Sequence, residues 1–139
     1  MSQERGVLVQ SGLSDWATAL FADWTGHLFA GLYANDREPD RTSTLADFTE
    51  ATFSGYARVY LSGFAIDSWD GIRLLTKADP VAFFHNGGPV GENIFGLFVA
   101  DDRTGLQYAV RFSTAPIVLY RPTDALTYSP FVALQSLFP

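Results

Sequence analysis

The stretch TSTLADFTEATFSGYARVYL, residues 42–61, gathers side chains that can act as acids and bases. Asp47 and Glu50 supply carboxyl groups, and Tyr56 and Arg58 follow them. Two carboxyl groups that face each other across a cleft can cleave a glycosidic bond, but the sequence singles out no such pair among its fifteen acids. Each residue also suits a structural role, because Asp47 can cap a helix and Arg58 can lie against tyrosine rings. We therefore interpret the stretch as structural.

Nucleophilic catalysis needs a nucleophile, a base and an orienting acid. The chain offers two candidate bases, His27 and His85, and it contains no Cys. No Gly-x-Ser-x-Gly motif is present to place a serine on a sharp turn between a strand and a helix. Both histidines fall in segments with a strand-like pattern, so we expect each to be a hydrogen-bonded structural residue. The sequence predicts no catalytic residues, and we predict that the protein is not an enzyme.

Metal and phosphate sites have equally little support. The pair Asp101-Asp102 offers oxygen ligands for Ca²⁺, but a tight hairpin turn needs the same residue types. We favour the turn. The loop Asn86-Gly87-Gly88-Pro89 leads into a strand-like segment, whereas phosphate-binding loops lead into a helix and carry Lys or Ser/Thr at fixed positions. We predict neither a metal nor a cofactor.

One helix and many short strands must position these residues. A helix is predicted over residues 14–22, with Ser14 as its N-cap and a stripe formed by Trp16, Leu20 and Trp24. This stripe faces either the core or a partner. A loose capping box over residues 44–47 predicts a second, very short helix. Period-two alternation then predicts strands, which turn signals separate. The predicted strands cover residues 27–34, 56–61, 71–76, 81–85, 93–100, 106–113, 117–120 and 124–135.

Two of these strands predict the architecture. Residues 93–100 and 106–113 flank the turn Asp101-Asp102-Arg103-Thr104-Gly105 and form a predicted hairpin. Residues 93–100 are apolar on both faces, which is typical of a central strand that is covered on both sides. We predict a mainly β protein, an antiparallel β-sandwich or jelly-roll-like barrel with one short N-terminal helix. Residues 1–139 form one predicted domain, in which residues 1–12 are an N-terminal arm.

Composition limits the partners. The formal net charge of −6 makes nucleic acid an improbable partner, because phosphate binding needs a concentrated basic surface. No apolar run reaches the ~18 residues of a membrane helix, so we expect a soluble protein that binds no membrane. Aromatic residues make up 15% of the chain, including 12 Phe. We expect that some of these rings lie outside the core and are covered by another protein.

Five segments carry a resemblance to a known group of proteins: GVLVQSGLSDWATALF, HLFAGLYANDREPDRTSTLADFTEATFSGYARVYL, DPVAFFHNGG, NIFGLFVAD and YSPFVALQSLF. Their layout resembles small structural proteins encoded by tailed bacteriophages and prophages, and LADFTEATFSGYAR is the most distinctive piece. The resemblance implies a β-sandwich located in the virion, most simply a capsid decoration or cement protein. It implies the major capsid protein or other virion proteins as partners, and a homo-oligomer, with a trimer favoured. It carries over no active site.

The predicted interface residues lie mainly near the chain ends. The apolar residues Leu137, Phe138 and Pro139 should either return to the core or contact a neighbouring subunit. Arg5 belongs to a polar arm that a partner would order. Trp69 is the remaining predicted contact, and it also supports an alternative function. In that alternative, Trp69 and tyrosines in loops stack on sugars in a receptor- or glycan-binding module of a phage tail or fibre.

Overall fold

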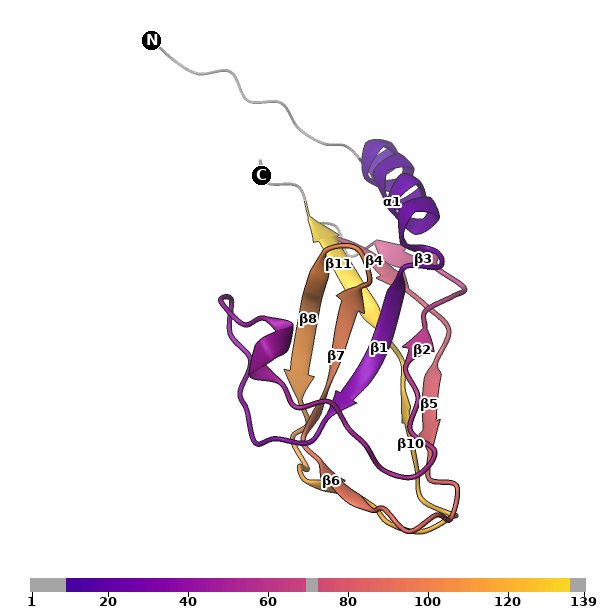
Figure 1. The fold of residues 1–139 in the computed structure, drawn as a ribbon. Helices are drawn as coiled ribbons and strands as arrows, with labels where there is room; N and C mark the ends of the chain where they lie inside the picture. The colour runs from indigo at the N-terminus through magenta and orange to yellow at the C-terminus, as the bar shows by residue number, and fades with distance from the viewer. Residues whose placement is uncertain (1–9, 70–72, 136–139) are drawn as a thin grey trace.

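The computed structural model describes residues 10–69 and 73–135 (Figure 1). Within these residues, one helix, α1 (Gln10–Trp24), precedes a series of short strands, and a single 3₁₀ turn, η1 (Leu45–Asp47), follows the first strand. The strands are β1 (Leu28–Tyr33), β2 (Val59–Tyr60), β3 (Ala65–Trp69), β4 (Arg73–Lys77), β5 (Val81–Phe84), β6 (Glu92–Ile94), β7 (Gly96–Asp101), β8 (Gly105–Arg111), β9 (Ile117–Leu119), β10 (Ala125–Tyr128) and β11 (Phe131–Gln135).

All of the strand pairs between these elements are antiparallel. The largest sheet has the order β2-β1-β7-β8, and a second sheet has the order β11-β4-β3. Two ribbons, β10-β5 and β6-β9, complete the fold. The prediction of a mainly β protein with antiparallel sheets and one N-terminal helix is therefore confirmed. The described strands form no closed barrel, so the sandwich alternative describes them better than the barrel.

The core lies between the four-stranded sheet and the strands that face it. Every residue of β1 and β7 is buried, and the two strands pair along their whole length. Leu32, Leu97 and Val99 point into the larger apolar cluster, while Phe29 and Phe98 point to the opposite face of the sheet. That opposite face is covered by the segment that carries η1. The prediction of a central strand covered on both sides is confirmed for β7.

Helix α1 packs on the three-stranded sheet, where it contacts β3, β4 and β11. It begins at Gln10, so Ser14 is an internal residue whose carbonyl oxygen accepts a hydrogen bond from Thr18, and not the predicted N-cap. The core alternative for the predicted stripe is also wrong at Trp16, which is 62% exposed, and the partner alternative stays a prediction. The helix buries Leu13 and Ala17 instead, because their spacing of four places both on the face toward Leu74.

Several predicted strand boundaries differ from the structure for local reasons. The predicted strand 93–100 divides at Phe95, whose amide donates to the Tyr33 carbonyl and whose carbonyl accepts from the Phe112 amide. The next residue must be glycine, because a Cβ atom on Gly96 would collide with the Val110 carbonyl and the Tyr33 ring. The predicted strand 124–135 divides into β10 and β11 before Phe131. Strand β3 was not predicted, because its last residues read as a turn.

Candidate protein-binding surfaces

Glu50 is the centre of the stretch that first suggested chemistry. Its carboxylate accepts two hydrogen bonds from Arg58, at 2.8 Å from Nη2 and 2.9 Å from Nε, and a third from the Tyr56 hydroxyl at 2.5 Å. Burial alone raises the pKa of Glu50, but the hydrogen bonds from Arg58 and Tyr56 outweigh it, so the pKa lies below its ordinary value. A carboxylate with these three bonds is held charged and in place, which suits a structural clamp better than a proton carrier.

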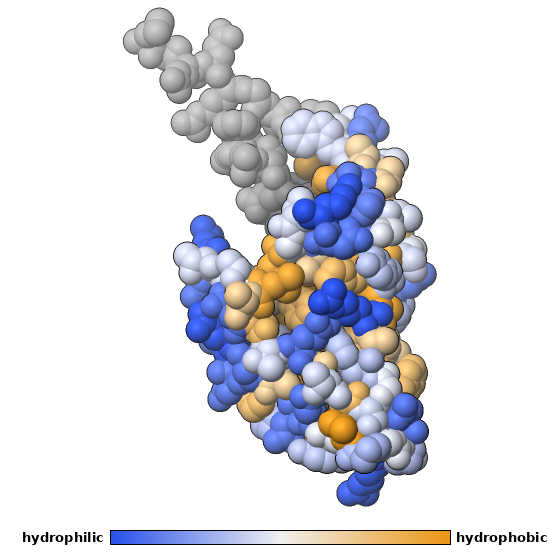
Figure 2. Space-filling model, viewed as in Figure 1, coloured by the Kyte–Doolittle hydropathy of each residue, from blue (hydrophilic) through white to orange (hydrophobic). Residues whose placement is uncertain are grey.

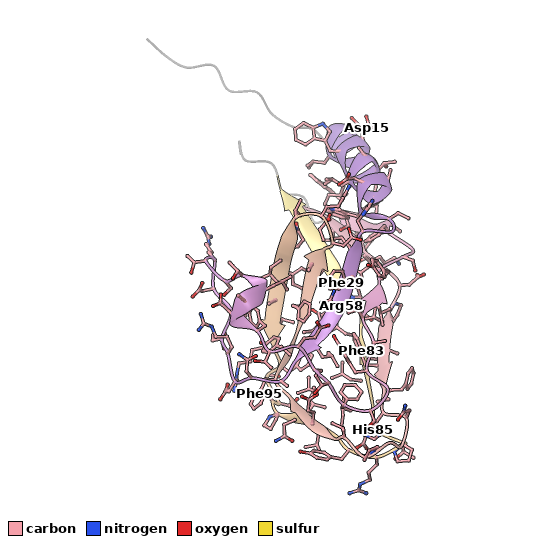
Figure 3. All side chains as sticks on the ribbon, viewed as in Figure 1. Asp15, Phe29, Arg58, Phe83, His85 and Phe95 are labelled. Atoms are coloured by element: carbon pink, nitrogen blue, oxygen red, sulfur yellow. The ribbon has the colours of Figure 1, made fainter. Side chains whose placement is uncertain are left out.

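The clamp ties the chain after η1 to the central strand β1. The Tyr56 hydroxyl accepts a hydrogen bond from the Leu32 amide at 3.2 Å. Arg58 lies over the Phe29 ring, with 4.5 Å between the guanidinium carbon and the ring centre (Figure 3). The sequence predicted a tyrosine ring as the partner of Arg58 on a strand over residues 56–61. Only Val59–Tyr60 pair as a strand there, and the ring belongs to β1.

The hydrogen bonds of the His85 ring are those of a structural residue. It is buried, its Nδ1 accepts a hydrogen bond from the Gly87 amide at 2.9 Å, and its Nε2 lies 2.8 Å from the Val90 carbonyl oxygen. The ring also stacks on Phe53. Both nitrogens are thus engaged by the backbone of the following loop, as expected for a hydrogen-bonded structural histidine.

A second polar cluster joins the end of α1 to the turn between β7 and β8. Arg103 contacts Asp101 at 2.8 Å and Asp23 at 3.1 Å, and His27 lies 2.9 Å from Asp102. His27 precedes β1 and is not inside a strand as predicted. His27, Asp101 and Asp102 bring possible ligand atoms within 4.8 Å of one another. Arg103 already neutralises Asp101, so the predicted role of this acid pair as a turn remains the better interpretation.

The Arg103 contacts predict how this turn responds to acid. Hydrogen bonds from the Arg103 side chain and backbone lower the pKa of Asp101 from its usual 3.8 to about 2. A lowered pKa in the folded state adds stability above pH 3.8, and this contribution is lost as the pH falls toward 2. We expect Asp101→Asn to lower the urea midpoint at pH 7, and the difference from the wild type to shrink by pH 2. The exposed Asp67→Asn is the control. A constant difference across this pH range would contradict the assignment.

Seven large apolar side chains are exposed in the described residues, namely Trp16, Tyr60, Ile66, Phe84, Val90, Val118 and Tyr120. Three of them lie on or beside the β6-β9 ribbon. Val118 is 53% exposed and Tyr120 is 50% exposed, while Leu119 between them is buried, so both point away from the core. We call Val90, Val118 and Tyr120 the β9 surface.

The β9 surface is held rigidly by its neighbours. Val118 pairs with Asn93 of β6. The Tyr120 ring lies so close to Gly91 that a Cβ atom there would collide with it. The Asp124 carboxylate accepts hydrogen bonds from the Tyr120 and Arg121 amides at 2.8 and 2.9 Å. Rigid exposed rings lose little conformational entropy when a partner covers them, so they favour protein–protein contact.

The predicted interface residues are only partly described. Trp69 is the last residue of β3 and is half-buried against the cluster of Leu13, Ala17 and Leu74, so it is not the exposed loop residue that the sugar-binding alternative used. Arg5, Leu137, Phe138 and Pro139 lie outside the described residues and remain predictions. Sequence reasoning missed Val118 and Tyr120, although residues 117–120 are apolar on both faces of a short strand.

Comparison with known proteins does not assign this chain to a family. No family model, curated protein or solved structure matches it. Among the described residues, no helix combines the length and the apolar character that a membrane crossing requires.

Proposed function

We propose that this chain is a non-enzymatic structural protein of a tailed-bacteriophage virion, a capsid decoration or cement protein. In this role it binds the major capsid protein or another virion protein and strengthens the lattice through protein–protein contacts. The sequence resemblance to small phage structural proteins supports the virion location. An acidic antiparallel sandwich with apolar side chains at its surface supports a binding role.

The observation that carries this proposal is the β9 surface. Val118 and Tyr120 are each at least half exposed, and the β6-β9 ribbon and Asp124 fix their backbone. Exposing an apolar patch to water is unfavourable, so a partner that covers the patch lowers the free energy of the system. A repeating capsid surface offers such a partner many times over, which suits a protein that works by binding alone.

The state of the titratable groups supports a function without catalysis. Glu50 is occupied by Arg58 and Tyr56, Asp101 by Arg103, and both ring nitrogens of His85 by backbone groups. An acid or base needs a proton site that substrate can reach. In these three groups the site is taken by a neighbouring part of the fold.

Binding to empty heads of the phage that encodes this chain tests the proposal. The double variant Val118→Ser/Tyr120→Ser should raise the Kd for heads ~10-fold or more, since truncated aromatic anchors commonly dominate an interface. Co-sedimentation at increasing protein concentration measures the Kd, and the melting temperature checks folding. Ile66→Ser, which removes an exposed apolar side chain from β3, is the matched control. If the double variant and Ile66→Ser lose affinity for heads equally, or if the double variant loses none, the β9 surface has no such role.

A second candidate function is a receptor- or glycan-binding module of a phage tail or fibre. The observation that favours it is the exposed Tyr120 ring beside the side-chain amide of Asn93. The Tyr120 hydroxyl lies 3.4 Å from the Asn93 side-chain oxygen. Sugars bind by stacking on such rings and by hydrogen bonds to neighbouring polar groups. A glycan array distinguishes the two, because a specific glycan signal that Tyr120→Ala abolishes would favour this candidate over capsid binding.

A further inference from the structure

Strand β8 leaves one edge of the four-stranded sheet open. It pairs with β7 on one side, and no other strand of residues 10–69 and 73–135 pairs with its opposite side. In an antiparallel pair, the backbone groups of alternate residues point to the same neighbour. The Phe112 amide points to Phe95, which continues the β7 side, so the backbone groups of Ala109 and Arg111 point outward. These unpaired groups form a template for another strand.

Spaces on both faces of the sheet flank this edge. On the inner face lies an apolar cavity of about 200 Å³, lined by Tyr108 of β8 together with Trp24, Leu28, Phe64, Val99 and Pro130. On the outer face lies a hollow of about 640 Å³ between β8 and the loop that joins β1 to η1. It is lined by Leu106, Ala109, Pro39, Asp40 and Arg41. Figure 2 shows apolar surface beside the segment that carries η1, over this part of the sheet.

The two spaces specify the kind of segment that fits the edge. Side chains of a strand alternate between the two faces of a sheet. A strand added to β8 would therefore place one side chain in the cavity and its neighbours in the hollow. A dry cavity of ~150 Å³ accepts a benzene ring, so the inner space suits a single leucine or phenylalanine side chain. The partner is thus an extended segment with one large apolar residue between smaller ones.

The residues directly before α1 have this pattern. Gly6-Val7-Leu8-Val9 is uncharged and strand-forming, with Leu8 on one face and Val7 and Val9 on the other. Arg5 shares the face of Val7 and Val9, so it would face the hollow that Asp40 lines. The Asp40 Oδ1 accepts hydrogen bonds from Thr42 and Ser43, while its Oδ2 has no partner within the described residues.

We propose that the β8 edge binds the Gly6–Val9 segment of a neighbouring copy, as a fifth strand of the β2-β1-β7-β8 sheet. Leu8 fills the inner cavity. A neighbouring copy is the donor because α1 packs on β3, β4 and β11 of the other sheet, and the helix extends away from the β8 edge (Figure 1). Head-to-tail exchange of this kind gives a ring when the rotation between copies closes and a filament when it does not. The inference goes beyond the proposed function, which concerns binding to other virion proteins, and it gives a physical form to the homo-oligomer that the sequence resemblance implies.

Edge-blocking variants test the proposal in solution. Ala109→Pro removes the outward amide and obstructs strand addition, while proline is tolerated on an edge strand. We expect light scattering to give an oligomer for the wild type and for Ala109→Ser, and a single-chain mass for Ala109→Pro. Val7→Asp/Val9→Asp changes the donor alone and should also give single chains. A wild-type monomer, or an oligomer that survives both variants, would overturn the inference.

Cysteine crosslinking tests the pairing even where Ala109→Pro fails to fold. The chain contains no Cys, so single cysteines report one contact each. We mix a Val7→Cys chain with a tagged Ala109→Cys chain under mild oxidation and expect a mixed disulfide dimer. Asp67→Cys replaces Ala109→Cys in the control, where we expect at least a tenfold smaller yield. Equal yields would overturn the inference. If the crosslink fails but the chains with the cysteine substitutions still bind capsids, this inference is wrong and the proposed function stands.

Discussion

Replacing Phe98 with alanine should lower the free energy of unfolding by about 3–5 kcal/mol. Phe98 is 2% exposed on the central strand β7, and its ring meets Phe29 edge-on with 6.2 Å between ring centres. It also lies so close to Gly31 of β1 that a Cβ atom there would collide with it. The β1 backbone against the ring is held by its pairing with β7, so it cannot move into the cavity that the substitution leaves. Urea unfolding followed by tryptophan fluorescence measures the change.

Phe84 provides the matched control for this substitution. It is also a strand phenylalanine, but it is 61% exposed, so Phe84→Ala removes little buried area. We expect Phe84→Ala to change the free energy of unfolding by less than about 0.5 kcal/mol. A loss of similar size in both variants would contradict the assignment of the core to the region around β1 and β7.

Replacing Glu50 with alanine should cost about 1–3 kcal/mol of stability. The change removes the acceptor of the Tyr56 hydroxyl and leaves Arg58 without its carboxylate. Tyr56 is partly buried, and its ring contacts Phe53 and Phe83. Glu50 is partly exposed, and solvent screening keeps the cost below that of a fully buried pair. Urea midpoints at pH 7 measure the effect. Glu38→Ala, on the exposed loop, is the control and should be nearly neutral.

The same clamp has a defined pH dependence. The pKa of Glu50 lies below its usual 4.5 in the folded protein. The carboxylate therefore stabilises the fold above that value, and this contribution is lost as the pH falls through the lowered pKa. The difference between the wild type and Glu50→Ala should shrink in acid. Arg58→Ala should remove much of the same free energy, so the double variant should be less destabilised than the sum of the singles. Additive losses would contradict the clamp.

Local patterns in the sequence predict much of the fold. Alternation and turn residues predict the β7-β8 hairpin and β7 as a central strand, and both are present. The capping box also predicts the short η1 helix, where the Thr44 amide donates to the Asp47 carboxylate at 2.8 Å. These features depend on residues close together in the chain, so local propensity decides them.

Features that depend on distant residues are not predictable in this way. The helix face is decided by Leu74, which selects Leu13 and Ala17 over the larger Trp16. The break at Phe95 depends on bonds to Tyr33 and Phe112. The outward position of Tyr120 depends on its pairing beside β6, since both faces of residues 117–120 are apolar. Tertiary contacts override local pattern at each of these points.

The most direct test of the proposed function is to measure how many copies of this protein bind to each empty phage head at saturation. Heads and protein are mixed at increasing ratios, sedimented, and quantified in pellet and supernatant. The cement proposal predicts saturable binding at a reproducible number of copies per head, weakened by Val118→Ser/Tyr120→Ser and retained by Ile66→Ser. Protein that stays in the supernatant at every ratio, as in samples without heads, would contradict it and leave the glycan-binding alternative as the one to pursue.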